Sequence, residues 1–173
     1  MNIVLIGYRG TGKSSIGAIL AERLARALVS SDAEIITRAG RSIPEIVQQS
    51  GWDHFRDLES EVCRDLGGKD GLVIDTGGGA ILRAENVVNL KKSGALFWLT
   101  ADVPTIVARI GGDSQRPSLT GTKSFLEEIA EVLEERRPKY RAAADHTIAT
   151  DGRSLTDVAQ DILERLEKLG LLI

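Results

Sequence analysis

Eight residues near the start of the chain have the types and spacing of a phosphate-binding loop. The run Gly7–Ser14 (GYRGTGKS) matches the pattern G-x-x-x-x-G-K-[ST]. Its glycines let backbone N–H groups turn toward phosphate oxygens, and Lys13 can place a positive charge beside the β- and γ-phosphates. The hydroxyl of Ser14 can bind Mg²⁺, and a helix beginning there favours negative charge at its N-terminus. The run predicts a nucleotide phosphate site, without specifying the reaction.

A second group of residues could bind a phosphate acceptor. Asp32 follows a predicted strand, where its carboxylate could orient a hydroxyl and take its proton, or could simply cap a helix. Arg56 alone could be a solvated surface residue. With Arg116 and Arg136 it could grip a carboxylate or stabilise a transferring phosphoryl group. Gly77–Gly79, after another predicted strand, would let the backbone approach a ligand closely.

Three classes of phosphate-loop protein are open at this point: GTPases, ATPases and small-molecule kinases. The guanine-reading tetrapeptide Asn-Lys-x-Asp, which a GTPase usually needs, does not occur in the chain. A large mechanical ATPase needs a longer chain than 173 residues.

Short apolar runs alternate with helical stretches along the chain. This alternation predicts an α/β fold, a P-loop three-layer α/β/α domain with a parallel sheet of about five strands. Ligands then gather at the carboxyl ends of the strands. The predicted strands are 3–6, 27–30, 72–76, 95–100 and 147–150, and the predicted helices are 14–28, one from 42 continuing over 52–66, 84–93, one from 102, 124–137 and 154–169.

One stretch, residues 111–123 (GGDSQRPSLTGTK), is rich in Gly, Ser and Thr and has no apolar period. A long loop of this composition beside a phosphate site predicts a mobile lid. No internal repeat or interdomain linker is evident, so residues 1–173 are expected to form a single domain.

Composition and charge argue against several other classes. Lys and Arg number 22 against 25 Asp and Glu, a net charge of −3 that argues against a general binder of nucleic acid or acidic membranes. The one cysteine, Cys63, allows no internal disulfide, and no Cys/His cluster has zinc-ligand spacing. No apolar run approaches the ~18 residues of a membrane span, and no signal peptide is evident. We therefore expect a cytoplasmic protein, and a monomer because no apolar stripe requires a partner.

The motifs together resemble the shikimate kinase family along nearly the whole chain. A phosphate loop alone is shared by many families, whereas this set in this order is much more specific. The matching stretches are GYRGTGKSS at 7–15, SDAEI at 31–35, RAGRSI at 38–43, GWDHFRDLESE at 51–61, TGGGAI at 76–81, RPSLTG at 116–121 and ERRPKY at 135–140.

The resemblance implies ATP-dependent phosphorylation of shikimate at its 3-hydroxyl, with Mg²⁺ as cofactor. Asp32 would match the carboxylate that binds the acceptor hydroxyls and acts as the base. Arg56 and Arg136 would match the pair that grips the substrate carboxylate. The backbone that lines the substrate would be Gly77, Gly78 and Gly79.

On the nucleotide side, the resemblance implies that Lys13 acts on the phosphates and that Arg116 joins it when the lid closes. Arg109 would lie against the adenine, and Arg153 would fall in the segment that flanks the base. The other ATP-binding residues would be Gly10, Thr11, Gly12, Ser14 and Ser15.

Three positions depart from the family pattern. The family usually has Asp-x-Asp after the second strand, where this chain has Ser30-Ser31-Asp32, so one carboxylate that supports the metal is missing. Asp75 stands where the family usually has a small residue. We hypothesise that Asp75 replaces the missing carboxylate near Mg²⁺, where Ser14 is the expected ligand and Asp32 is a further candidate. The alternative is that Asp75 only hydrogen-bonds Ser14 or loop N–H groups. Leu155 replaces a proline often found against the base.

Two alternative functions stay open. One is a kinase of another small hydroxy acid or of a nucleotide, which a panel of acceptors would reveal. The other is a nucleotide-binding relative that has lost catalysis, motivated by the missing carboxylate at Ser30. That alternative predicts ATP binding without acceptor-dependent release of ADP.

Overall fold

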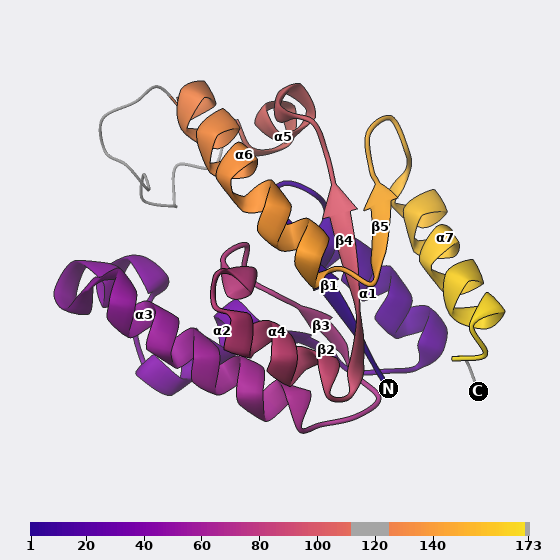
Figure 1. Cartoon of the computed structure of the whole chain (residues 1–173), viewed down its shortest axis with the longest axis horizontal. Helices are drawn as coiled ribbons and strands as arrows, with labels where there is room; N and C mark the ends of the chain where they lie inside the picture. The colour runs from indigo at the N-terminus through magenta and orange to yellow at the C-terminus, as the bar shows by residue number, and fades with distance from the viewer. Residues whose placement is uncertain (112–124, 172–173) are drawn as a thin grey trace.

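The computed structural model describes residues 1–111 and 125–171 (Figure 1). Strands and helices alternate along the chain as the apolar pattern predicts. In chain order the elements are β1 (Asn2–Ile6), α1 (Lys13–Leu24), β2 (Leu28–Ser30), α2 (Ser31–Ala39), α3 (Ile43–Gly67), β3 (Val73–Asp75), the short 3₁₀ helix η1 (Ala80–Leu82), α4 (Ala84–Lys91), β4 (Gly94–Thr100), α5 (Val103–Ile110), α6 (Phe125–Ala143), β5 (His146–Ala149) and α7 (Leu155–Lys168).

The strands form one five-stranded parallel sheet in the order β2-β3-β1-β4-β5. Its central strand β1 is buried along its whole length, as expected for an apolar run covered on both faces. The chain moves from β1 to one side of the sheet and then returns to place β4 on the other side. This reversal lies beside the end of β1, where ligands bind in open α/β sheets.

Helices cover both faces of the sheet, which confirms the predicted three-layer α/β/α fold (Figure 1). On one face, α1 and α7 pack over residues such as Leu5 and Phe97. On the other face, α3, α4 and α6 pack over residues such as Val4 and Leu96. The alternation of neighbouring β1 and β4 residues between two cores follows from the two-residue period of a strand.

The predicted helix over 14–28 is wrong at its C-terminal end, because α1 stops at Leu24. Ala25 adopts a left-handed conformation (φ 50°), and the backbone N–H of Arg26 donates to the Ala21 carbonyl. The chain can then enter β2 after a short turn. The helix α2 was not predicted; it begins when the Ser30 side chain accepts a hydrogen bond from the N–H of Ala33.

The predicted end of the helix over 124–137 is also wrong, because α6 continues through Pro138 to Ala143. Pro138 has no N–H to give to the carbonyl of Glu134, but both residues are exposed, so water can satisfy that carbonyl. Burial of Tyr140 and Ala143 in the core holds the last turns in place.

The helix predicted from Ser42 begins there, with the expected capping box between Ser42 and Glu45. Gly51 breaks the helical conformation within α3 with a φ of 82°, between the two segments that the sequence suggests. The predicted lid, 111–123, lies outside the described residues except for Gly111, which ends α5.

Candidate active site

The phosphate loop connects β1 to α1, as predicted. Gly12 stands at the N-cap of α1 in a left-handed conformation (φ 91°), which L-residues rarely adopt. No side chain caps this helix, so its first N–H groups have no side-chain acceptor at the N-cap. Ser14 and Ser15 are exposed in the first turn. A phosphate oxygen is the ligand that such a helix start attracts.

Lys13 is buried and folds back over the loop. Its Nζ donates to the carbonyl oxygens of Gly7 at 2.8 Å and Tyr8 at 3.1 Å. The hydroxyl of Thr11 donates to the same Tyr8 carbonyl at 2.8 Å. These bonds hold the ammonium group beside the loop, where it can neutralise phosphate charge.

A hydrogen bond joins the phosphate loop to the neighbouring strand β3. The Ser14 hydroxyl donates to Oδ2 of Asp75 at 2.6 Å, and Asp75 is 8% exposed. Asp75 ends β3, so its carboxylate lies at the edge of the sheet where β1 also ends. A hydroxyl beside a carboxylate is a set of oxygen ligands that suits Mg²⁺.

Asp32 lies in the first turn of α2, half-buried, and not at its N-cap, which is Ser30. A Cβ on Gly77 would lie only 2.5 Å from Oδ1 of Asp32, so the two segments meet closely and a larger residue at position 77 would displace the Asp32 carboxylate. The hydroxyl of buried Ser31 accepts a 2.9 Å hydrogen bond from the Gly77 N–H. The start of α2 and the glycine segment are therefore fixed against each other.

Arg56 lies on α3 and is held by Glu59, one turn further along the helix. Its Nη1 donates to Oε2 of Glu59 at 2.6 Å, and the two side chains are 14% and 1% exposed. The Arg56 guanidinium also lies near the rings of Trp52 and Phe55, 5.5 and 5.1 Å from their centroids. It would collide with a Cβ on Gly79. Arg56 is thus a partly buried, oriented cation, and the solvated-surface alternative is wrong.

Glu59 is the electrostatic centre of this cluster. Burial raises the pKa of its carboxyl group, and the nearby guanidinium of Arg56 opposes that rise. The charges of Asp32 and Arg136 also act on it, so the structure brings these side chains together around Glu59. Its Oε1 atom is buried and has no hydrogen-bond partner within the described residues.

Tyr140 connects α6 to the glycine segment. Its hydroxyl donates to the Gly78 carbonyl at 2.5 Å, and its ring stacks on Trp98 with centroids 5.6 Å apart. Burial raises the pKa of Tyr140, and the neighbouring Arg136 opposes this. Arg136 lies four residues earlier on the same helix. The described part of α6 therefore brings Arg136 to Tyr140, whose hydroxyl bonds the glycine segment.

Arg109 spans two parts of the expected nucleotide site. Its guanidinium donates to the Gly10 carbonyl at 3.1 Å, and to the hydroxyl and the carbonyl of Thr150, both at 3.0 Å. Leu155 lies on the other side of the loop, where its Cδ2 is 3.4 Å from the position of a Cβ on Gly12. Arg153 instead points toward α7, where it pairs with Asp161 at 3.1 Å.

Arg116, predicted to reach the phosphates, lies outside the described residues. In the described ranges, no group of three or more His, Cys, Asp or Glu side chains could hold a metal ion. Mg²⁺ at a nucleotide site needs only one or two carboxylates, because phosphates and water supply the other ligands. No helix in residues 1–111 or 125–171 is both long and apolar enough to span a membrane.

Two parts of the site were missed by sequence reasoning. The sequence did contain a signal for Glu59, because a spacing of three residues from Arg56 on a predicted helix puts the two side chains on one face. The sequence contained no such signal for Tyr140, since its contact with Gly78 joins segments 62 residues apart.

The fold and this site define a class, that of P-loop kinases acting on a small molecule. A phosphate loop and a cluster of oriented arginine and carboxylate groups share one edge of a parallel sheet.

Comparison with known proteins narrows this class. A family model described as shikimate kinase matches residues 9–167. The shikimate kinase of Symbiobacterium thermophilum is 41% identical over 172 residues, 98% of each chain. That of Geobacter sulfurreducens is 43% identical over 161 residues, covering 93% of this chain and 88% of the other. The solved structure of Acinetobacter baumannii shikimate kinase in complex with shikimate matches with a TM-score of 0.92 and 36% identity, covering 98% of this chain and 94% of the other. The chain belongs to the shikimate kinase family, and it is a kinase.

Proposed function

We propose that this chain transfers the γ-phosphoryl group of ATP to the 3-hydroxyl of shikimate. The observation that carries the proposal is the Arg56–Glu59 pair, oriented against Gly79 and set beside Asp32. A rigid guanidinium next to a hydroxyl-orienting carboxylate suits an acceptor with one carboxylate and several hydroxyls. The shikimate complex of the Acinetobacter baumannii relative supports this choice of acceptor.

Arg56 and Arg136 bind the acceptor carboxylate in this proposal. Glu59 accepts a hydrogen bond only from Nη1 of Arg56. The other edge of the planar guanidinium can therefore still donate two hydrogen bonds to a carboxylate. The N–H groups of Gly78 and Gly79 line the acceptor beside Arg56, whose guanidinium lies against Gly79. Glu59 contacts Arg56 and not the reacting atoms, so it is a positioning residue.

Asp32 acts as the base of the reaction. Its carboxylate accepts the proton of the 3-hydroxyl as the hydroxyl oxygen forms a bond to the γ-phosphorus. The bond from the γ-phosphorus to the β–γ bridging oxygen breaks, and ADP leaves with that electron pair. Lys13 neutralises charge on the phosphates, together with N–H groups of Gly10, Thr11, Gly12 and the first turn of α1. Arg116 adds a second cation in this proposal, as the resemblance implies.

The donor set at the end of β3 fits a magnesium ion. Ser14 and Asp75 would hold it, because a hydroxyl and a buried carboxylate are hard oxygen ligands next to the phosphate loop. When bound, Mg²⁺ neutralises developing charge on the β- and γ-phosphate oxygens. This arrangement divides two carboxylates between two tasks, with Asp75 serving the metal and Asp32 serving the acceptor.

We place the adenine between Arg109 and Leu155. Arg109 is fixed by three hydrogen bonds, so its planar guanidinium offers a ready stacking surface. The aliphatic Leu155, 45% exposed, offers an apolar surface facing it across the loop. Arg153 supports the start of α7 through Asp161 and therefore shapes the base site indirectly.

The direct test is ADP release from ATP and Mg²⁺ with and without shikimate. We expect release that depends on shikimate and that falls by at least about 100-fold in Asp32→Asn, because the base is lost. Arg64→Gln, at an exposed residue of α3, serves as a control and should keep turnover within about threefold.

The alternative functions give different results in the same assay. A kinase of another hydroxy acid would release ADP with a different member of an acceptor panel and not with shikimate. A catalytically silent relative would bind ATP and release no ADP with any acceptor. Either result would reject the proposed activity.

We also propose that residues 1–173 form one kinase domain that works as a monomer in the cytoplasm. One sheet and its two helical layers contain all described elements, which supports the single domain.

A further inference from the structure

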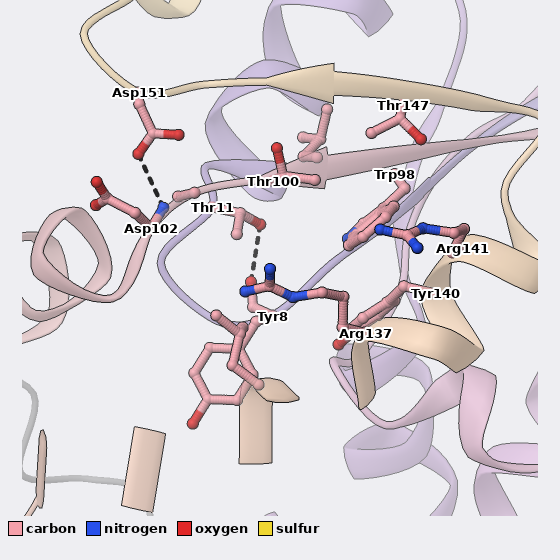
Figure 2. Close-up of a pocket in the computed structure, with 13 residues that line it drawn as sticks. Tyr8, Thr11, Trp98, Thr100, Asp102, Arg137, Tyr140, Arg141, Thr147 and Asp151 are labelled. Atoms are coloured by element: carbon pink, nitrogen blue, oxygen red, sulfur yellow. Dashed lines mark hydrogen bonds between the residues drawn. The ribbon is translucent and has the colours of Figure 1, made fainter. Parts of the chain in front are cut away.

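A cavity lies beside the phosphate loop, between α6 and the ends of β4 and β5 (Figure 2). Its volume is about 330 Å³. Trp98 and Thr100 from β4, Arg137 and Arg141 from α6, and Thr147 from β5 form much of its wall. This volume is at the lower end of the range for small-molecule sites.

The cavity adjoins the proposed acceptor and nucleotide sites through Tyr140 and Thr11 but lacks their central residues. Its lining includes none of Asp32, Arg56 and Glu59, and none of Lys13 and Ser14. Thr11 and Tyr8 of the phosphate loop form one wall, so the cavity lies behind the loop. Nothing in the proposed reaction uses it.

Two arginines give the cavity a positive end. Arg137 and Arg141 are four residues apart on α6, so they lie on one face of the helix. Figure 2 shows both side chains extending from α6 in the same direction, into the cavity. Arg137 has an ion-pair contact of 3.8 Å with Glu134, whose side chain is 78% exposed, and such a contact contributes little. Both guanidinium groups can therefore bind an anion.

The opposite end of the cavity is acidic but already engaged. Asp102 accepts a hydrogen bond from the Thr105 N–H at 2.8 Å, and Asp151 accepts one from the Asp102 N–H at 2.9 Å. The hydrogen bonds from Thr105 to its carboxylate lower the pKa of Asp102, so it stays charged. These carboxylates repel an anion, which places the charged end of a ligand at the arginines.

An aromatic wall stands between the two ends. The indole of Trp98 lines the cavity, and its ring stacks on Tyr140 with an angle of 13° between the planes. Figure 2 shows the hydroxyl-bearing side chains of Thr100 and Thr147 along the same wall. A planar apolar group fits against an indole, and a carboxylate matches the planar fork of an arginine.

From this juxtaposition of two arginines with Trp98 we infer that the cavity binds a small aromatic carboxylate. The test uses benzoate as the probe and the fluorescence of Trp98 as the signal. The chain has two tryptophans, so Trp52→Phe leaves Trp98 as the single reporter. We expect a saturable change in emission with a dissociation constant of about 1 mM or tighter, as suits so small a ligand.

Chemical analogues and variants define which groups are recognised. Benzamide, which has no charge, and cyclohexanecarboxylate, which has no aromatic ring, should each bind at least about fivefold more weakly. Arg137→Gln and Arg141→Gln should each raise the benzoate dissociation constant at least about fivefold. Arg64→Gln, an exposed residue on α3, is the matched control and should leave it unchanged.

Four results would overturn the inference. The first is no saturation up to about 20 mM benzoate. The second is a benzoate dissociation constant that is the same in Arg137→Gln, in Arg141→Gln and in the wild-type protein. The third is competition by shikimate or ATP, which would place benzoate in the acceptor or nucleotide site. The fourth is a second copy of the chain occupying the cavity, which sedimentation at several protein concentrations would detect.

Discussion

The hydroxyl of Ser14 donates a 2.6 Å hydrogen bond to Asp75, joining the first turn of α1 to the end of β3. Asp75 is the direct register partner of Ser30 on the neighbouring strand β2. Ser30 occupies the position where the family pattern leads one to expect a carboxylate, and its side chain caps α2 instead. The carboxylate of Asp75 therefore lies one strand nearer to the phosphate loop than position 30 does.

We predict that Asp75→Asn weakens metal binding. The amide keeps the size of the side chain and can still bond Ser14, but it loses the charge that attracts a divalent cation. Mn²⁺ binding to the complex with ADP, followed by electron paramagnetic resonance, should weaken at least about tenfold, as a lost charged ligand implies. The KM for shikimate should stay within about twofold, because Asp75 does not contact the acceptor.

The matched control is Asp70→Asn. Asp70 is 73% exposed and pairs with the N-terminal amine, at the opposite edge of the sheet. It should leave Mn²⁺ binding unchanged. Equal Mn²⁺ affinity in the wild-type protein and in Asp75→Asn would show that Asp75 only positions Ser14.

Glu59→Gln should impair acceptor binding without touching the acceptor. The change removes the charged partner that holds the Arg56 guanidinium. We expect the KM for shikimate to rise about tenfold and the KM for ATP to stay within about twofold. A tenfold rise in both KM values would indicate a general loss of structure instead.

The same substitution should change how stability depends on pH. Burial raises the pKa of Glu59 above its ordinary 4.5, so the folded chain binds this proton more tightly than the unfolded chain does. Its contribution to stability is fully present below pH 4.5 and is lost as the pH rises through the raised pKa. The free energy of unfolding of wild type relative to Glu59→Gln should therefore fall as the pH rises from about 4.5 toward neutrality, measured by urea denaturation. A difference that is constant with pH would contradict this.

Two buried tyrosines offer a matched pair of substitutions. Tyr140→Phe removes the hydrogen bond to the Gly78 carbonyl and should lower the free energy of unfolding by about 1–2 kcal/mol. The Tyr8 hydroxyl is buried and has no hydrogen-bond partner in the described ranges, so Tyr8→Phe should change stability by less than about 0.5 kcal/mol or increase it. Urea denaturation measures both. Equal effects would show that the Tyr140 hydrogen bond is not stabilising.

Gly79→Ala should displace Arg56. A Cβ at this position would meet the Arg56 guanidinium, which is the end of a flexible side chain and can move away. We expect the KM for shikimate to rise at least about tenfold, with stability nearly unchanged. Gly68→Ala, where the nearest atom is 3.5 Å from the new Cβ, controls for the loss of a glycine. An unchanged KM in Gly79→Ala would show that Arg56 does not bind the acceptor.

Local patterns were enough to predict the layers of the fold and the phosphate loop. The apolar run of β1, the loop Gly7–Ser14 and the Ser42–Glu45 capping box all depend on residues close in sequence. Helix ends were harder, because they depend on tertiary packing. Pro138 suggests an end to α6, but burial of Tyr140 carries the helix past it.

The candidate site could be predicted in its residue types but in few of its pairings. The hydrogen bond between Asp75 and Ser14 was one of the alternatives that the sequence offered, and it is present. That Arg56 would lie against Gly79 could not be predicted, because this contact depends on the α3–η1 packing. The Tyr140–Gly78 bond depends on how α6 lies across the sheet, which no local pattern encodes.

The most direct test of the proposed activity is phosphorus NMR of a reaction with ATP, Mg²⁺ and shikimate. We predict one new phosphomonoester signal, coupled to the proton on carbon 3 of shikimate, that grows in step with ADP. Formation of ADP with inorganic phosphate alone, or a phosphomonoester at another hydroxyl, would contradict the account.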